Sequence, residues 1–427
     1  MFLKTVLADG AAEQRVIREM KARADSARGD IETTVRAIMD DVRARGMEAV
    51  EEYSEKFDGC KPYIIERDVL DRAYTSCDPK LITALEKAAA NIRDYHEQML
   101  VRSWQYCRGE GQLLGQTVRG LARVGIYVPG GTAAYPSSVL MNAIPAKVAG
   151  VGEIIMVTPP TENLNNAVLA AAKIAGIDTV IACGGVQAIA ALTYGAGFIP
   201  LVDKIVGPGN AFVAAAKKLA FGDVDIDMIA GPSEVLVIAD STADPTCVAA
   251  DLLSQAEHDR LASAVLLTDS MPQAQAISAE MERQAKLLPR WNIIRESVEN
   301  YGCAIVFEEL ADACRVADLV APEHLEIVTA QPRELLPLLH NAGAIFLGAY
   351  APEPLGDYMA GPCHVLPTSG TARFFSPLST DTFLKKTSII EYSKDALAAL
   401  ADDIVALAES EHLDAHANSI KVRFREV

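Results

Sequence analysis

Four of the seven histidines in this chain lie near carboxylate or amide side chains, in clusters whose atoms could bind a metal ion and transfer a proton. Imidazole nitrogens and amide or carboxylate oxygens suit a zinc-like ion of moderate softness. A histidine with an ordinary pKa of about 6.5 also exchanges protons near neutral pH. These residue types indicate an enzyme. The clusters are Gln255 with His258, Glu323 with His324, Asp357 with His364, and Glu411 with His416.

The first cluster lies in a stretch with helical periodicity. Gln255 and His258 are three residues apart, so in a helix they share one face and could reach one cation. Such a pair is also common on the exposed surface of a helix. The spacing alone therefore leaves both interpretations open.

The second cluster, Glu323 followed by His324, comes directly after Pro322, which predicts a loop running into a strand over residues 325–329. Neighbouring residues of a regular strand point to opposite faces, so the two side chains share a site only where the backbone bends. There the histidine would act as acid and base, and the glutamate would activate water. A histidine that hydrogen-bonds its own strand is an equally consistent interpretation.

The other two clusters lie in loops or beyond a helix end. Asp357 and His364 fall in two stretches dense in proline and glycine, and rigid loops of this kind often carry function. Glu411 and His416 are five residues apart, beyond a predicted helix. They would point to different sides of a continuous helix, so their convergence requires a break near Leu413–Asp414.

The order of the remaining elements predicts an α/β protein. Two charged amphipathic helices over residues 11–56 and a third over 79–101 come first. Strand, turn and helix then alternate in two series with a boundary near Gly231–Pro232, which is typical of parallel sheets. The predicted strands are residues 122–128, 153–158, 179–182 and 203–206, then 234–239, 262–268, 303–307 and 343–348, and a last helix is predicted over 395–409.

Three strand ends of the first series combine a glycine turn with a polar or aromatic residue, namely Tyr127, Gln187 and Asn210. The carboxyl ends of parallel strands line one edge of a sheet, where ligands bind. The sequence contains neither the dinucleotide fingerprint Gly-x-Gly-x-x-Gly after a strand nor a phosphate-binding loop with Gly-Lys-Ser/Thr. The glycines would equally well serve only as tight turns.

Length and composition bound the class of protein. A chain of 427 residues predicts two or more globular units. The net charge of −18 argues against a nucleic-acid or anionic-membrane partner and favours a cationic substrate. We find no membrane-spanning apolar run and no secretory leader, and the eight cysteines lack paired short spacing, so we expect reduced thiols in a cytoplasmic protein.

Longer motifs extend over nearly the whole chain and are more specific than the single pairs. They are Arg123–Gly131 (RVGIYVPGG), Tyr135–Asn142 (YPSSVLMN), Val202–Asn210 (VDKIVGPGN), Ile226–Glu234 (IDMIAGPSE), Ala250–His258 (ADLLSQAEH), Ala321–Glu326 (APEHLE), Gly356–Tyr358 (GDY), His364–Thr368 (HVLPT) and Ala415–Ala417 (AHA). With these motifs the chain resembles the histidinol dehydrogenase family.

The resemblance implies an enzyme that oxidises L-histidinol to L-histidine through L-histidinal, using two NAD+ and one water, in histidine biosynthesis. It implies one Zn2+ per subunit, held by Gln255, His258, Asp357 and His416. Glu323 would activate the water, and His324 would be the acid and base. Ser233, His324, His364 and Glu411, with the zinc ligands, would hold the substrate, and Tyr127, Gln187 and Asn210 would line the NAD site.

The resemblance also implies two incomplete Rossmann-like lobes and an intertwined homodimer, in which Glu411 and His416 serve the partner's site. Residues 29–121 with 235–375 would form the lobe with the metal and catalytic residues, and 122–234 the NAD lobe. Residues 1–28 would form an N-terminal helical segment. Residues 376–427 would form a C-terminal segment for dimerisation that reaches the partner subunit.

Three residues depart from those common in the family: Cys363 stands where asparagine is common, His412 where glycine is common, and Ile229 where proline is common. None of them replaces a residue with an implied role. Two alternatives stay open, a paralogous zinc and NAD dehydrogenase of another small polar alcohol and a non-catalytic metal- or nucleotide-binding protein. Glu411 favours an amine-bearing substrate over the first, and Glu323 with His324 argues against the second.

Overall fold

The computed structural model describes residues 2–22, 28–130, 135–160, 164–229 and 231–425. The chain folds into two compact units. The larger unit comprises Met1–Met99 and Leu121–Phe383, and the smaller unit comprises Leu100–Gly120 and Leu384–Val427. Among the described residues, no helix is long and apolar enough to cross a membrane.

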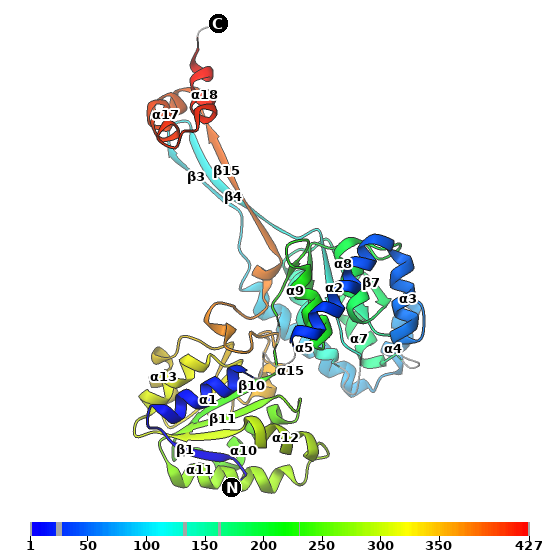
Figure 1. The fold of residues 1–427 in the computed structure, drawn as a ribbon, viewed down its shortest axis with the longest axis vertical. Helices are drawn as coiled ribbons and strands as arrows, with labels where there is room; N and C mark the ends of the chain where they lie inside the picture. The colour runs from blue at the N-terminus through cyan, green and yellow to red at the C-terminus, as the bar shows by residue number, and fades with distance from the viewer. Residues whose placement is uncertain (1, 23–27, 131–134, 161–163, 230, 426–427) are drawn as a thin grey trace. The chain divides into compact units, whose positions relative to one another are not determined.

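The first sheet of the larger unit, whose strand β7 is labelled in Figure 1, has six strands in the order β2-β7-β6-β5-β8-β9. The strands from β7 to β9 run parallel, whereas β2 pairs antiparallel with β7 at the edge. The four strands predicted in the first series are confirmed. Their bounds, with those of the edge strands, are β2 (Tyr63–Ile65), β5 (Arg123–Tyr127), β6 (Glu153–Thr158), β7 (Thr179–Ala182), β8 (Lys204–Val206) and β9 (Asp225–Ile226).

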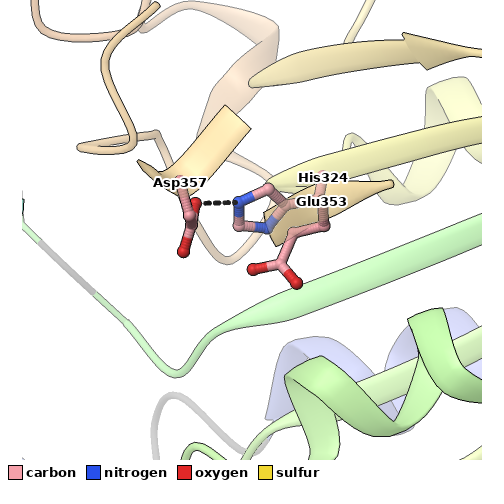
Figure 2. Close-up of side chains that lie close together, drawn as sticks. All are labelled: His324, Glu353 and Asp357. Carbon is pink, nitrogen blue, oxygen red and sulfur yellow. Dashed lines mark ion pairs between the residues drawn. The ribbon is translucent and has the colours of Figure 1, made fainter. Parts of the chain in front are cut away.

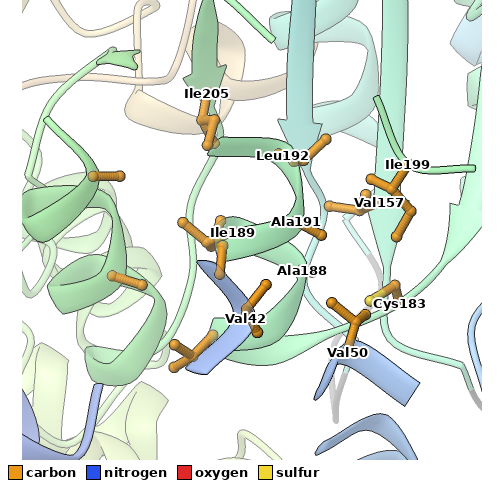
Figure 3. Packing of buried hydrophobic residues seen from close by; sticks show 14 of the residues in the cluster. Val42, Val50, Val157, Cys183, Ala188, Ile189, Ala191, Leu192, Ile199 and Ile205 are labelled. Atoms are coloured by element: carbon orange, nitrogen blue, oxygen red, sulfur yellow. The ribbon is translucent and has the colours of Figure 1, made fainter. Parts of the chain in front are cut away.

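The helices around this sheet form two groups. The first follows the strands: α6 (Pro136–Val148), α7 (Asn166–Ala175), α8 (Gly185–Tyr194) and α9 (Ala211–Ala220). The second precedes them: α2 (Arg28–Arg45), α3 (Met47–Asp58), α4 (Arg67–Ser76) and α5 (Pro79–Glu97). Val42 of α2 and Val50 of α3 join one buried cluster with Ile189 of α8 (Figure 3). Helix α8 is buried over most of its length because the sheet covers one side of it and α2 and α3 cover another.

This packing differs from the predicted division into lobes. Helices α2 to α5, predicted to join residues 235–375, instead pack against the helices of the first sheet. Amphipathic periodicity shows that a helix buries one face, but it does not say against which sheet. Residues Lys4–Leu7, predicted within an N-terminal helical segment, form strand β1.

The second sheet of the larger unit has the order β1-β12-β11-β10-β13-β14, and all its strands are parallel. Every residue of β10 and β11 is buried, because helices cover both faces of the sheet. The strands are β1 (Lys4–Leu7), β10 (Glu234–Ala239), β11 (Ser263–Thr268), β12 (Cys303–Val306), β13 (His324–Val328) and β14 (Ala344–Leu347). The helices are α1 (Ala11–Ala22), α10 (Pro245–Ala256), α11 (Met271–Ala285), α12 (Trp291–Tyr301), α13 (Leu310–Val320), α14 (Pro332–Leu335) and α15 (Glu353–Tyr358), with 3-10 turns at Leu336–Leu338, Thr371–Arg373 and Thr380–Phe383.

The smaller unit is an antiparallel sheet, β15-β4-β3, followed by short helices. Its elements are β3 (Trp104–Gly109), β4 (Gln112–Gly120), β15 (Leu384–Tyr392), α16 (Lys394–Ala398), α17 (Ala401–Ser410), α18 (Asp414–Lys421) and a 3-10 turn at Val422–Phe424. The helix predicted over 395–409 is therefore two helices. Several large apolar side chains of this unit are exposed, among them Trp104, Ile390 and Leu407, at 52%, 75% and 67%.

Candidate active site and metal centre

The two residues of the Glu323–His324 cluster meet at the amino-terminal edge of the second sheet. His324 is the first residue of β13 and pairs in register with Val235 of β10. Three residues before His324, Ala321 follows the last residue of α13 with a φ of 50° and turns the chain. After this bend, Nδ1 of His324 lies 3.7 Å from Oε2 of Glu323. The backbone bend that a shared site requires is thus present.

Backbone groups of Glu234 hold both side chains. Its N–H donates to Oε2 of Glu323 at 2.9 Å, and its carbonyl oxygen lies 3.1 Å from Nδ1 of His324. A carbonyl can only accept, so it favours the tautomer with the proton on Nδ1 and leaves Nε2 free to take a proton. Nε2 has no hydrogen-bond partner among the described residues and lies 3.7 Å from Oδ1 of Asp357 (Figure 2).

The electrostatics of the pair suit proton transfer. Burial raises the pKa of Glu323 to about 8, because the carboxylate loses its hydration. Burial alone would lower the pKa of His324, but the nearby carboxylates of Glu323 and Asp357 outweigh it and raise that pKa to about 10. Strongly shifted groups side by side in one buried cluster are typical of catalytic acids and bases.

Helix α10 supplies the amide of the same cluster. Gln255 is buried in the last turn of α10, and its Nε2 lies 3.4 Å from Oε2 of Glu323 and 3.2 Å from Nδ1 of His324. Its Oε1 is buried without a hydrogen-bond partner among the described residues. An amide oxygen left unpaired in a buried polar site is an unsatisfied acceptor that a cation would satisfy.

His258 lies two residues beyond α10, in the turn closed by its N–H and the carbonyl oxygen of Gln255, 3.1 Å apart. Burial lowers the pKa of His258, whereas the carboxylate of Asp357 acts in the opposite direction. The net shift keeps the imidazole neutral at neutral pH, which is the form that binds a metal ion.

Asp357 lies close to both His364 and His324. Asp357 lies in α15, and its carbonyl oxygen and Oδ1 are 3.2 and 4.0 Å from Nδ1 of His364. Nε2 of His364 lies 3.2 Å from the hydroxyl of Ser138 in α6. Burial raises the pKa of Asp357, but His324 and His364 outweigh it and lower that pKa, so the carboxylate is negative at neutral pH.

The sequence prediction missed Glu353, which begins α15 four residues before Asp357. Its carboxylate, that of Asp357 and a ring nitrogen of His324 lie within 4.8 Å of one another, close enough for one metal ion (Figure 2). Oε2 of Glu353 accepts a hydrogen bond from Ser254 at 2.6 Å. The helical i, i+4 spacing of Glu353 and Asp357 was the signal that could have found it.

Three of the predicted residues lie apart from these contacts. Ser233 is half-buried and directly precedes β10, so it adjoins Glu234, whose backbone groups hold Glu323 and His324. Glu411 and His416 belong to the smaller unit and are exposed. Helix α17 ends at Ser410 and α18 begins at Asp414, so the break near Leu413–Asp414 that convergence of Glu411 and His416 requires is present.

The residues that depart from the family pattern have local explanations in two cases. His412 has a φ of 57°, a conformation that glycine adopts without strain, and it lies in the break between α17 and α18. Cys363 is buried, its Sγ donates to the carbonyl oxygen of Met141 at 3.3 Å, and burial raises its pKa to about 12. It is therefore a packed thiol rather than a thiolate. Nothing in the structure explains Ile229.

Tyr127 ends β5, and Gln187 and Asn210 follow β7 and β8; the carboxyl ends of these strands lie at one edge of the first sheet. The hydroxyl of Tyr127 accepts the N–H of Gly185 at 3.2 Å. Nε2 of Gln187 donates to Oδ2 of Asp58 at 3.1 Å, while its Oε1 is buried without a partner among the described residues. The Oδ1 of Asn210 caps α9. All three side chains thus also serve the local fold, and the unpaired amide oxygen of Gln187 fits a ligand with a donor.

Parallel sheets, a buried glutamate–histidine pair and neighbouring metal-ligand atoms define an α/β enzyme with acid–base chemistry. The sequence model of the family "Histidinol dehydrogenase" matches residues 21–424. The histidinol dehydrogenase of Bacillus subtilis is 53% identical over 431 residues and that of Heliobacterium mobile 53% over 400, covering 100% and 92% of this chain and 100% and 94% of those proteins. The crystal structure of histidinol dehydrogenase from Elizabethkingia anophelis superposes with a TM-score of 0.93 at 36% identity, covering 99% of this chain and 98% of that one.

The chain therefore belongs to the histidinol dehydrogenase family. It is an NAD-dependent dehydrogenase.

Proposed function

We propose that this enzyme oxidises L-histidinol to L-histidine through L-histidinal, consuming two NAD+ and one water, in histidine biosynthesis. The observation that carries the proposal is the buried Glu323–His324 pair, which lies beside Gln255 and Asp357 in a member of this family. An alcohol becomes a carboxylic acid only if a base removes the alcohol proton and a second group activates water. The pair supplies both. L-Histidinol-dependent formation of NADH by the purified enzyme tests the proposal.

The metal would be zinc, one per subunit, held by Gln255, His258, Asp357 and the His416 of a second copy. The partnerless Oε1 of Gln255, the neutral His258 and the ionised Asp357 fit this role. When bound, the ion supplies a template that holds the imidazole and amine nitrogens of the substrate. The competing set, His324 with Glu353 and Asp357, would occupy the nitrogen that the base needs, so we assign Glu353 no role as a ligand.

His324 would act in both oxidations. With Nδ1 donating to Glu234, its Nε2 accepts the hydroxyl proton of the alcohol while the carbinol carbon gives up a hydride. The same nitrogen then serves the aldehyde hydrate, which is also an alcohol. The nearby carboxylates raise the pKa of His324 and so stabilise its imidazolium form, and the ring must lose this proton before it accepts one from the alcohol.

Glu323 would take a proton from the water that attacks the aldehyde. A carboxylate whose pKa is raised to about 8 is a far stronger base than an ordinary glutamate. The Glu234 N–H fixes Oε2 at 2.9 Å, so the base is held in one position. The resulting hydrate remains in the site for the second oxidation, which prevents escape of the reactive aldehyde.

Other predicted residues would orient the substrate and cofactor. Ser233 and His364 would bind the substrate beside the metal, and Glu411 of the second copy would make a charge-assisted hydrogen bond to its ammonium group. NAD+ would bind at the edge of the first sheet formed by Tyr127, Gln187 and Asn210.

A homodimer with shared sites would bring the second copy's tail residues to each cluster. The exposed apolar side chains of the smaller unit, including Trp104 and Leu407, are the surface that such a dimer would cover. In each chain the proposed acid–base residues, Glu323 and His324, belong to the larger unit, and Glu411 and His416 belong to the smaller unit. Because each site of the proposed dimer would combine residues from two chains, two variants altered at different residues could complement each other.

We predict that two inactive variants restore activity when their subunits are mixed. In a heterodimer of His416→Asn and His324→Asn chains, one of the two sites has every residue intact. Random exchange should therefore give about one quarter of wild-type activity. Activity is measured after reversible dissociation of an equimolar mixture.

The matched control is a mixture of His324→Asn with Glu323→Gln, in which both changes lie in the larger unit and no heterodimer site is intact. This mixture should show no more activity than the two variants measured separately. Proven subunit exchange without rescue in the first mixture would contradict a shared site.

A further inference from the structure

The loop between β8 and α9, residues Gly207–Asn210, is held by an ion pair buried in the larger unit. Lys217 of α9 and Asp227, which directly follows β9, form this pair, and their side chains are only 3% and 2% exposed. Removing two charges from water is unfavourable, and a buried pair persists only where its geometry and additional hydrogen bonds compensate. The additional hydrogen bonds here go to the loop.

Both polar groups of Gly207 are engaged by the pair. Its N–H donates to Oδ2 of Asp227 at 2.8 Å, and its carbonyl oxygen accepts from Nζ of Lys217 at 2.8 Å. The other carboxylate oxygen, Oδ1, accepts the N–H of Met228 at 2.6 Å. The Lys217 ammonium and the Asp227 carboxylate thus hydrogen-bond to the two backbone groups of Gly207 and also pair with each other.

Gly207 lies directly against Tyr127, one of the predicted NAD residues. Gly207 has a φ of +107°, and a Cβ at this position would lie 2.2 Å from the carbonyl oxygen of Tyr127. No side chain larger than hydrogen fits there. Three residues later, Asn210 caps α9 and presents its remaining amide group at the same strand edge. The position of the loop therefore fixes the separation of Tyr127 and Asn210.

We propose that Lys217 and Asp227 are positioning residues for the dinucleotide, which act by holding Gly207–Asn210 against Tyr127. This inference rests on the proposed NAD site. Neither side chain would touch the cofactor, because both are buried beneath the loop. Their loss would leave the loop free to move away from Tyr127 and would weaken NAD+ binding while the chemistry at His324 continues at saturating NAD+.

The test compares Lys217→Met with a control at a second Lys–Asp pair around the same sheet. Lys147 of α6 binds Asp178 at 2.8 Å, and that carboxylate also accepts a backbone N–H, from Ile154 at 2.8 Å. Asp178 directly precedes β7, so this pair lies at the opposite, amino-terminal edge of the strands. Lys147→Met removes the same charge from a Lys–Asp pair that is partly exposed and lies away from the loop.

Two measurements on the full-length zinc enzyme test whether Lys217 and Asp227 position the loop for NAD+. The KM for NAD+ should rise about tenfold in Lys217→Met, with kcat within about twofold and an unchanged KM for L-histidinol, whereas Lys147→Met should change none of them. Hydrogen–deuterium exchange without cofactor should be faster over residues 206–213 in Lys217→Met alone. NAD+ binding by calorimetry provides the equilibrium counterpart.

Asp227→Asn covers the case in which Lys217→Met does not fold. It keeps an oxygen that can accept the Gly207 N–H but loses the charge that holds the lysine, so it should show the same changes to a smaller degree. An unchanged KM for NAD+ and unchanged exchange in a folded variant would overturn the proposal. If wild-type enzyme failed to reduce NAD+ with L-histidinol, the proposed function would fail, while the exchange experiment would still report on the loop.

Discussion

Replacing His324 with asparagine is expected to lower the rate of histidinol oxidation by about 10³-fold, because the variant lacks the base that would take the alcohol proton in the proposed site. Asparagine keeps a donor for the Glu234 carbonyl oxygen but cannot accept a proton at the position of Nε2. The rate is measured as initial NADH formation from L-histidinol.

The zinc content of this variant distinguishes the two candidate ligand sets. If Gln255, His258 and Asp357 hold the ion with the second copy's His416, one zinc per subunit should remain in His324→Asn. Loss of the metal would instead favour the set of His324, Glu353 and Asp357. The exposed His340, paired with Asp318 at 2.8 Å, provides a control, and His340→Asn should leave rate and metal unchanged.

Replacing Glu323 with glutamine is expected to slow the oxidation of added L-histidinal by about 10²-fold, and the oxidation of L-histidinol to the aldehyde much less. Glutamine still accepts the Glu234 N–H but takes no proton from water. The two half-reactions are followed separately in single-turnover experiments. Glu308→Gln, an exposed change, serves as the control.

The pH profile gives this prediction a second readout. Glu323 must be ionised to act as a base, and burial raises its pKa to about 8. The rate of histidinal oxidation by wild-type enzyme should therefore rise with pH through this range, and Glu323→Gln should lose that rise. Equal damage to both half-reactions would show that Glu323 has no special part in the attack of water.

The elements of the larger unit were largely predictable because most of the predicted strands are short runs rich in Val, Ile and Leu between turn residues. β10 is an example, since both its faces are covered and every residue is apolar after Glu234. The strands of the smaller unit carry no such signal. β3 is exposed at every residue, and β4 pairs not only with β3 but also with β15, which begins only at Leu384.

The sequence indicated several residues that cluster in the larger unit, but not the geometry of the cluster. Spacing indicated Gln255 with His258, yet only the fold brings both beside β13, which begins nearly 70 residues later. The backbone groups of Glu234 that hold Glu323 and His324 have no sequence signature, because any residue supplies an N–H and a carbonyl. Long-range register set these contacts, and local pattern does not encode it.

The most direct test of the proposed reaction is the number of NADH molecules formed per L-histidinol consumed, in excess NAD+, before and after chelation and return of zinc. We predict two NADH per histidinol, with activity lost on chelation and restored by zinc. One NADH per histidinol, with free L-histidinal accumulating, or undiminished activity after verified removal of the metal, would contradict the proposed four-electron, zinc-dependent reaction.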